Sequence, residues 1–163
     1  MSFEKALSEY QEEVGHLVRL LDEITEDEIN YIPVRKDGWS IKRHILHLVN
    51  SETQSMLRIM MMENKPSNII NVIDSSDWID NIDINLVSTR ACVDYLEKIS
   101  DMIVVLIRAF GNNSYKNKKI KCLYQNENVE VFMYEDIESG IDHFKFHQEF
   151  IRENLFEYKE KMS

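Results

Sequence analysis

The scarcity of glycine and proline is the feature of this sequence that most restricts its fold. Its 163 residues include four glycines and two prolines. A sandwich or barrel of short strands needs a turn about every 8–12 residues, and such turns rely on these two residue types. The chain lacks that punctuation, so we expect long helices instead. Because its length is that of one domain and no linker or repeat interrupts it, we predict a single domain spanning residues 1–163.

Apolar residues recur at helical spacing in four long segments of the chain. The helices predicted from this spacing cover residues 3–24, 40–62, 83–110 and 135 to near the C-terminus. Thr25 begins a capping-box pattern, which predicts a short helical turn before Pro33, and Ser40 is a suitable N-cap for the second long helix. Gly111 is expected to end the third helix. These patterns predict an all-α fold, an antiparallel four-helix bundle.

One segment departs from the helical pattern. Between residues 112 and 134, KIKCLY and VEVFMY alternate polar and apolar residues on either side of the polar stretch QNEN. Alternation of this kind is typical of strands, and a polar stretch between two strands favours a turn. We therefore predict a small β-hairpin around residues 119–133 as an excursion from the bundle.

The charge of the chain restricts its partners. The formal net charge is −10, which repels phosphate backbones and anionic membrane surfaces. The longest apolar run, MIVVLI at 102–107, falls far short of the roughly 20 residues that a membrane span needs. Cys92 and Cys122 have no C-x-x-C spacing and indicate reduced thiols. We expect a cytoplasmic protein with neither nucleic acid nor a membrane as partner.

All five histidines lie in predicted helices, and two of them share one face. His143 and His147, in IDHFKFHQEF, are four residues apart, so both rings project from the apolar side of the last helix about one turn from each other. Two imidazoles at this spacing can reach a single metal ion. The alternative is a pair of core histidines whose nitrogens are satisfied by neighbouring groups.

A second cluster of titratable residues lies in DGWSIKRHILHLVNSE, residues 37–52. On a helical wheel His44 lies just beside the apolar stripe, His47 further round its edge, and Glu52 near its centre. A buried carboxylate needs a metal ion, a histidine or a basic partner to neutralise it. The alternative to a site is an ion pair of Glu52 with an arginine such as Arg19, Arg90 or Arg108.

Several common active-site motifs are absent from the sequence. There is no H-E-x-x-H, as in thermolysin-like proteases, and none of His44, His47, His143 and His147 follows a glutamate at the E-x-x-H spacing of di-iron carboxylate bundles. There is also no P-loop, no G-x-G-x-x-G and no G-x-S-x-G. Phosphoryl transfer, dinucleotide redox chemistry and serine hydrolysis therefore lack their usual sequence motifs.

The combination of IP-x4-GWSI-x5-HLVNSE in an early helix with HFKFH in a late helix resembles the DinB/YfiT-like superfamily. Members of this family are four-helix bundles that commonly hold one divalent metal ion through three histidines. The family's first ligand lies eight residues after the tryptophan, which here is His47 and not His44. Its other two ligands form a late H-x3-H, which here is His143 and His147.

The resemblance also carries expectations about chemistry. Three neutral imidazoles leave a coordination position open for water, a thiol or a substrate, and they suit Zn²⁺, Ni²⁺, Fe²⁺ or Mn²⁺. Family members include transferases that use low-molecular-weight thiols, so the resemblance implies metal-assisted thiol transfer or hydrolysis of a small-molecule substrate. Glu52 would then act as general base or orient a histidine.

Two other interpretations remain. One is a non-catalytic bundle that binds a metal ion or small ligand and acts as a homodimer; the other treats the histidines as core residues held by neighbouring carbonyls. The chain also departs from many relatives, which carry a histidine where it has Phe146 and a glutamine where it has Phe150. Both differences make the expected pocket more apolar. The roles of His16 and His44 are left open.

Overall fold

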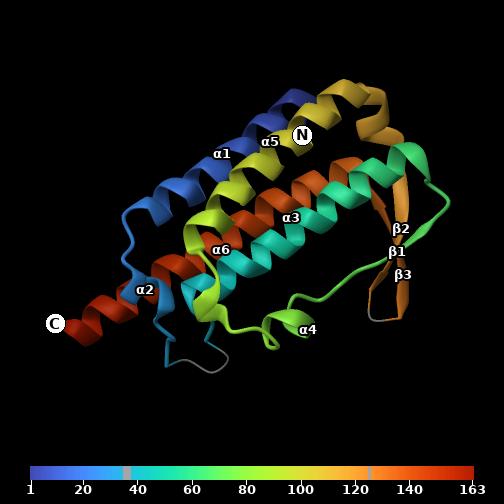
Figure 1. The fold of residues 1–163 in the computed structure, drawn as a ribbon. Helices are drawn as coiled ribbons and strands as arrows, with labels where there is room; N and C mark the ends of the chain where they lie inside the picture. The colour runs from blue at the N-terminus through green and yellow to red at the C-terminus, as the bar shows by residue number, and fades with distance from the viewer. Residues whose placement is uncertain (35–37, 125) are drawn as a thin grey trace.

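Four long helices form a bundle in the computed structural model, which describes residues 1–34, 38–124 and 126–163, apart from the side chains of residues 76 and 77 (Figure 1). The long helices are α1 (Phe3–Asp22), α3 (Ile41–Asn64), α5 (Thr89–Asn117) and α6 (Met133–Met162). The predicted all-α four-helix bundle is confirmed. The long helices agree with the predicted segments to within a few residues at most ends.

Two helices run in each direction along the bundle. In Figure 1 α1 and α6 run one way, and α3 and α5 run the other. Ion pairs between the two ends of α1 and the opposite ends of α5, Glu4 with Arg108 and Asp22 with Arg90, show that these neighbours are antiparallel. Helices α3 and α6 are the second antiparallel pair. Because α3 and α5 are parallel, the chain between them must travel back along the bundle.

That return segment, residues 65–88, lies against α3. It contains the short strand β1 (Ile69–Asn71), helix α4 (Ser76–Ile79) and the 3-10 helix η1 (Ile84–Leu86). The side-chain amides of Asn50 and Gln54 both donate to the carbonyl of Ile73, at 3.1 and 2.7 Å, and the Ile73 amide donates to Gln54 Oε1 at 2.8 Å. These bonds fix the segment beside the middle of α3, so its next residues also lie close to that helix.

A small sheet closes one end of the bundle (Figure 1). Strands β2 (Lys119–Tyr124) and β3 (Glu127–Phe132) form an antiparallel hairpin, which confirms the hairpin predicted around residues 119–133. Strand β1 adds to β2 in parallel, with Ile70 opposite Cys122. The sequence did not predict this third strand, because three residues are too few for alternation to be recognised.

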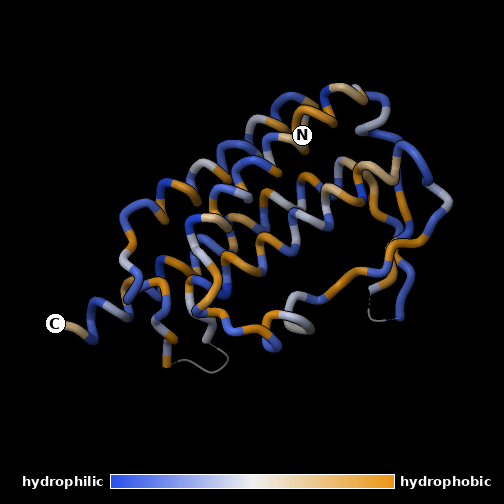
Figure 2. The backbone as a smooth tube through the Cα atoms, viewed as in Figure 1, coloured by the Kyte–Doolittle hydropathy of each residue, from blue (hydrophilic) through white to orange (hydrophobic). Residues whose placement is uncertain are grey.

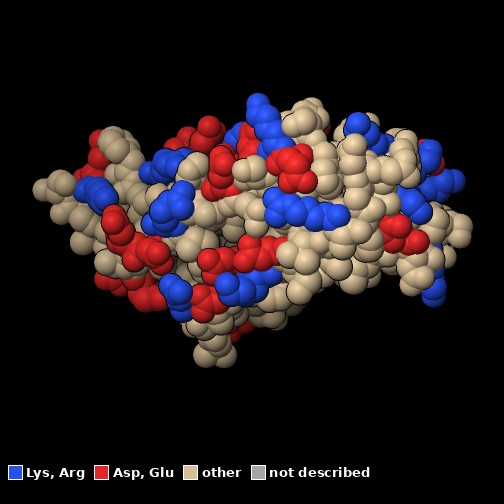
Figure 3. Space-filling view, turned by 90° about the horizontal axis from the view of Figure 1, so that it is seen from above, with Lys and Arg blue, Asp and Glu red and all other residues tan. Residues whose placement is uncertain are grey.

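The helices are amphipathic, and their apolar stripes meet inside the bundle (Figure 2). Leu7, Leu48, Leu96, Ile103 and Phe144 are completely buried and represent all four long helices. Burying side chains of this size contributes roughly 1.5–3 kcal/mol each, so the stripes supply most of the stability that holds the helices together. On the face of the molecule in Figure 3, basic and acidic side chains are mixed.

Helix ends follow the sequence signals, with one exception. Thr25 and Glu28 form the predicted capping box at the start of α2 (Glu26–Asn30), and Ser40 Oγ accepts from the Arg43 amide at the start of α3. The third helix was expected to end at Gly111. Instead Gly111 only breaks it, with φ at 84° and ψ at 169°, and helical structure resumes as far as Asn117. The glycine thus permits a sharp bend within the element.

Among the described residues, no helix is long and apolar enough to cross a membrane. The cytoplasmic location stays a prediction.

Replacing Gly111 with alanine should lower the free energy of unfolding by ~1–3 kcal/mol, because a side chain is strained at this positive φ whatever the space around it. Asn112→Ala, in the exposed next position, is the matched control and should change it by less than about 0.5 kcal/mol. Urea denaturation measures both. Equal stability of the two variants would contradict the importance of this bend.

Candidate metal centre

Helices α3 and α6 bring three of the five histidines together. His47 Nε2 lies 2.9 Å from His143 Nε2, which lies 2.9 Å from His147 Nε2. One ligand nitrogen from each of these residues falls within 4.8 Å of the other two. Two nitrogens that share a tetrahedral zinc ion at about 2.0–2.1 Å lie about 3.3 Å apart, so the three rings are spaced as ligands of one ion would be.

The outer nitrogen of each ring faces a partner. The pairs are His47 Nδ1 with Ser75 Oγ at 2.6 Å, His143 Nδ1 with Ser51 Oγ at 3.4 Å, and His147 Nδ1 with His44 Nδ1 at 2.8 Å. A neutral imidazole has one N–H and one lone pair. When the outer nitrogens donate, the three inner lone pairs point at one another, an arrangement that is repulsive unless a cation lies between them. The cluster therefore fits a metal ion.

Burial keeps these rings neutral, the form that binds a metal ion. Burial, together with a smaller effect of His47, lowers the pKa of His143 to about 4, and burial together with smaller effects of the neighbouring histidines lowers the pKa of His147 to about 2. The pKa of His47 is also lowered, chiefly by burial. All three imidazoles are therefore free of an added proton at neutral pH.

The cluster opens on one side into a cleft of about 900 Å³. His47 and His143 line this cleft together with residues of the return segment, the hairpin and α6, whereas His147 is buried behind them. Among the described residues, no fourth histidine, cysteine or carboxylate joins the ligand group. An ion held by the three rings would thus keep a coordination position toward the cleft, as catalytic sites do.

Trp39 covers the cluster on another side. Its ring is stacked over that of His147, with 6.4 Å between centroids and 9° between planes, and lies 5.3 Å from the ring of His47. The Asn154 side chain donates to the Trp39 carbonyl at 2.7 Å and so ties this residue to α6. The sequence pattern WS before the helix marked this tryptophan as part of the family motif but did not reveal its contact with the rings.

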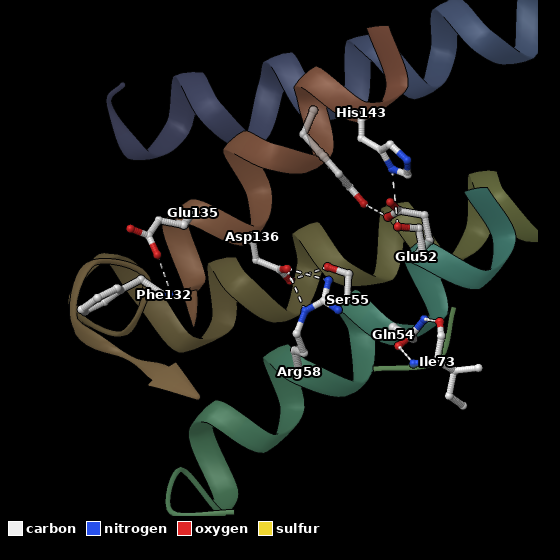
Figure 4. A network of polar contacts seen from close by, with 11 residues as sticks. Glu52, Gln54, Ser55, Arg58, Ile73, Phe132, Glu135, Asp136 and His143 are labelled. Carbon is white, nitrogen blue, oxygen red and sulfur yellow. Dashed lines mark hydrogen bonds and ion pairs between the residues drawn. The ribbon is translucent and has the colours of Figure 1, made fainter. Parts of the chain in front are cut away.

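Glu52 lies close to the cluster but outside it. It is almost completely buried and accepts a hydrogen bond from the hydroxyl of Tyr10, and Figure 4 shows it facing the space below His143. Glu52 and His143 also line a common cavity of about 40 Å³. Burial raises the pKa of Glu52 to about 7, although the bond from Tyr10 opposes this rise.

The expected arginine partners of Glu52 lie elsewhere or make other contacts. Arg90 pairs with Asp22 and Asp94 at the surface, and Arg108 pairs with Glu4. The buried carboxyl instead accepts from Tyr10, and Arg58, which lines the same small cavity, also acts to lower its pKa. The sequence pattern could not predict this, because Tyr10 occupies an ordinary apolar position of the first helix.

A buried ion pair connects helices α3 and α6 farther from the histidines. Arg58 Nε donates to Asp136 Oδ1 at 2.8 Å, and Ser55 Oγ donates to Asp136 Oδ2 at 2.6 Å (Figure 4). Arg58 and Asp136 also line the cleft. Arg58 lies on α3 and Asp136 on α6, so sequence spacing alone did not identify this pair.

His16, Phe146 and Phe150, which the sequence singled out, lie in different surroundings. His16 lies on α1 with a half-exposed side chain, near Glu13. Phe146 lines the cleft, and the ring of Phe150 stacks on His44. Ser51 and Ser75 were missed. Ser51 lies inside the recognised motif, but Ser75 comes from the return segment, where no local signal marks it.

Comparisons with known proteins show the same fold. No model of a known protein family matches the sequence, and no curated protein sequence matches it. The structure is similar to that of YfiT from Bacillus subtilis, which is described as a probable metal-dependent hydrolase with an unusual four-helix bundle topology. The TM-score is 0.81, and the match covers 94% of this chain and 87% of YfiT at 17% identity. The likeness shows that this chain has the same fold as YfiT.

The buried carboxyl of Glu52 should make the metal-free protein less stable as pH rises. Its pKa is raised from 4.5 to about 7, so between these values the folded state binds more protons than the unfolded state, and stability falls with increasing pH. In Glu52→Gln, where the amide oxygen can still accept from Tyr10, this loss disappears. As the pH rises from 5 to 8, the free energy of unfolding of the variant should increase relative to that of wild type by up to about 3 kcal/mol.

Urea denaturation of both chelator-treated proteins at several pH values measures this difference. Other titrating groups are common to both chains and cancel. A stability difference that is the same at pH 5 and pH 8 would contradict the raised pKa.

Proposed function

We propose that this chain is a metal-dependent enzyme that binds one divalent ion through His47, His143 and His147 and acts on a small molecule in the adjoining cleft. The convergence of three Nε2 atoms, with every outer nitrogen engaged by a partner, is the observation that carries the proposal. The fold shared with YfiT, a probable metal-dependent hydrolase, supports it.

A divalent ion held by His47, His143 and His147 would supply Lewis acidity, which would lower the pKa of water towards about 7 or favour the thiolate form of a thiol. The nucleophile would be water in hydrolysis and a low-molecular-weight thiol in transfer. Hydrolysis is the first choice, because it is the activity ascribed to YfiT. Thiol transfer is supported by the resemblance of the sequence motifs.

The chain's own residues have separate tasks in this proposal. His47 and His143 form the wall of the cleft that a substrate meets, while Ser75 and Ser51 hold their outer nitrogens. Glu52 is the proposed general base. A pKa of about 7 suits proton transfer at neutral pH, and the cavity that Glu52 shares with His143 lies beside the ligand group.

The nature of the ion and the assembly of the protein stay predictions. Nitrogen donors suit Zn²⁺, Ni²⁺, Fe²⁺ and Mn²⁺, and the site's geometry together with metal availability selects among them. The second candidate function is a non-catalytic bundle that binds a metal ion or small ligand as a homodimer. Where its ligand is a metal ion, it uses the same three histidines without turnover.

Metal content tests the ligand set. Untagged protein, purified without nickel resin, should contain one divalent ion per chain by elemental analysis. His47→Ala, His143→Ala and His147→Ala should each lose most of it, because two imidazoles hold an ion much more weakly than three. His16→Ala, at a half-exposed position of α1 outside the ligand group, is the control and should keep the ion. Full occupancy after removal of one of the three histidines would exclude that residue as a ligand.

Activity assays separate the two candidate functions. Metal-loaded protein should hydrolyse members of a panel of ester and amide substrates, or transfer thiols to electrophilic acceptors, and His143→Ala should lose this activity while His16→Ala keeps it. Glu52→Gln should bind the ion and lower kcat by about 10²–10⁴-fold if Glu52 is the general base. Absence of turnover with every metal and substrate class would support the binding function instead.

A further inference from the structure

The fourth histidine of the site, His44, lies behind the ligand group and not within it. Its Nδ1 atom is 2.8 Å from Nδ1 of His147, and the two residues are only 4% and 3% exposed. His44 is not among the three residues whose ligand nitrogens converge. It meets the ligand group at the outer edge of His147.

Proton positions follow from this geometry. His147 directs Nε2 into the cluster, 2.9 Å from His143 Nε2, and this nitrogen needs its lone pair to bind an ion. The ring then carries its proton on Nδ1, which faces His44. The His44 Nδ1 atom must accept the hydrogen bond from this N–H through its own lone pair, so His44 carries its proton on Nε2. A single hydrogen bond thus fixes the tautomers of both rings.

The acceptor is held in place by packing. The ring of Phe150 stacks on that of His44, with 5.7 Å between centroids and 24° between planes, and the ring of Trp39 lies 5.4 Å away. These aromatic contacts restrict the rotation of the His44 ring. Its Nδ1 atom is therefore directed at His147 before any ion binds.

We propose that His44 is a positioning residue of the metal centre: it accepts a hydrogen bond from the Nδ1–H group of His147 and so fixes the tautomer and direction in which His147 presents Nε2 to a divalent ion. This inference rests on the proposed function. Loss of an outer partner of this kind typically lowers metal affinity by about 10–100-fold. Because the acceptor is an imidazole and not a carboxylate, it orients the ligand without placing a negative charge beside the ion.

Two substitutions of His44 separate the hydrogen bond from the packing. His44→Phe keeps an aromatic ring against Phe150 and Trp39 but removes the acceptor. His44→Asn is smaller and keeps a carbonyl oxygen near the position of Nδ1. His16→Asn, on the exposed side of α1, is the control for loss of a histidine.

Zinc affinity, measured by competition with a chromophoric chelator, is the first readout. His44→Phe should bind zinc about 10–100-fold more weakly than wild type, still with one ion per chain. His44→Asn should recover most of this loss, and His16→Asn should equal wild type. Thermal unfolding of the metal-free variants shows whether stability has changed as well. If His44 had a purely structural role, its variants would lose stability, and His44→Asn would not recover zinc affinity.

The second readout is ¹⁵N NMR of the histidine rings in the zinc-loaded protein. In wild type His147 should be protonated at Nδ1 and metal-bound at Nε2. The Nδ1 proton should exchange faster with water in His44→Phe than in His44→Asn, because its acceptor is gone. The wild-type spectrum needs no variant, so it tests the tautomer even if His44→Phe does not fold.

Three results would overturn the proposal. They are unchanged zinc affinity in His44→Phe, a His147 ring that carries its proton at Nε2, and loss of stoichiometric zinc from both variants, which would make His44 a ligand. Wild-type protein that binds no zinc or other divalent ion has a different meaning. It would overturn the proposed function, and this inference with it.

Discussion

Helices α3 and α6 pack antiparallel, and their contact places two pairs of histidines face to face. His47 meets His143, and His44 meets His147. Farther along the same contact Arg58 meets Asp136, about three turns from His47 on α3 and about two turns from His143 on α6. Since these intervals are close to whole turns, both sets of side chains lie on the facing sides of the two helices. One helix pair therefore carries the ligands and the inner wall of the cleft.

The return segment completes what this helix pair begins. Because α3 and α5 are parallel, the chain between them must run back along the bundle, and Asn50 and Gln54 bind it to α3 at Ile73. Ser75 follows two residues later and contacts His47. A simple up-and-down bundle would join these helices by a short loop at one end, which could not reach the histidines. The direction of the helices is thus a requirement of the site.

The sequence predicted what depends on local pattern. Helical spacing and caps placed the long helices, and alternation placed the hairpin around residues 119–133. The GWSI-x5-HLVNSE and HFKFH motifs selected the three histidines that the structure brings together. The contacts of Tyr10 with Glu52 and of Ser75 with His47 were not predictable, because each partner looks ordinary in its own segment and becomes significant only through packing. The same is true of the parallel pairing of β1.

Burial explains why the helical wheel and the family motif favoured different histidines. His44 lies nearer the apolar stripe of α3, so it turns inward and meets the buried His147. His47 lies at the edge of that stripe, so it turns toward the cleft beside His143. A site that keeps a coordination position accessible needs ligands at such an edge, whereas a residue that only orients a ligand can lie in the core. The less buried histidine of α3 is therefore the one placed to serve a substrate.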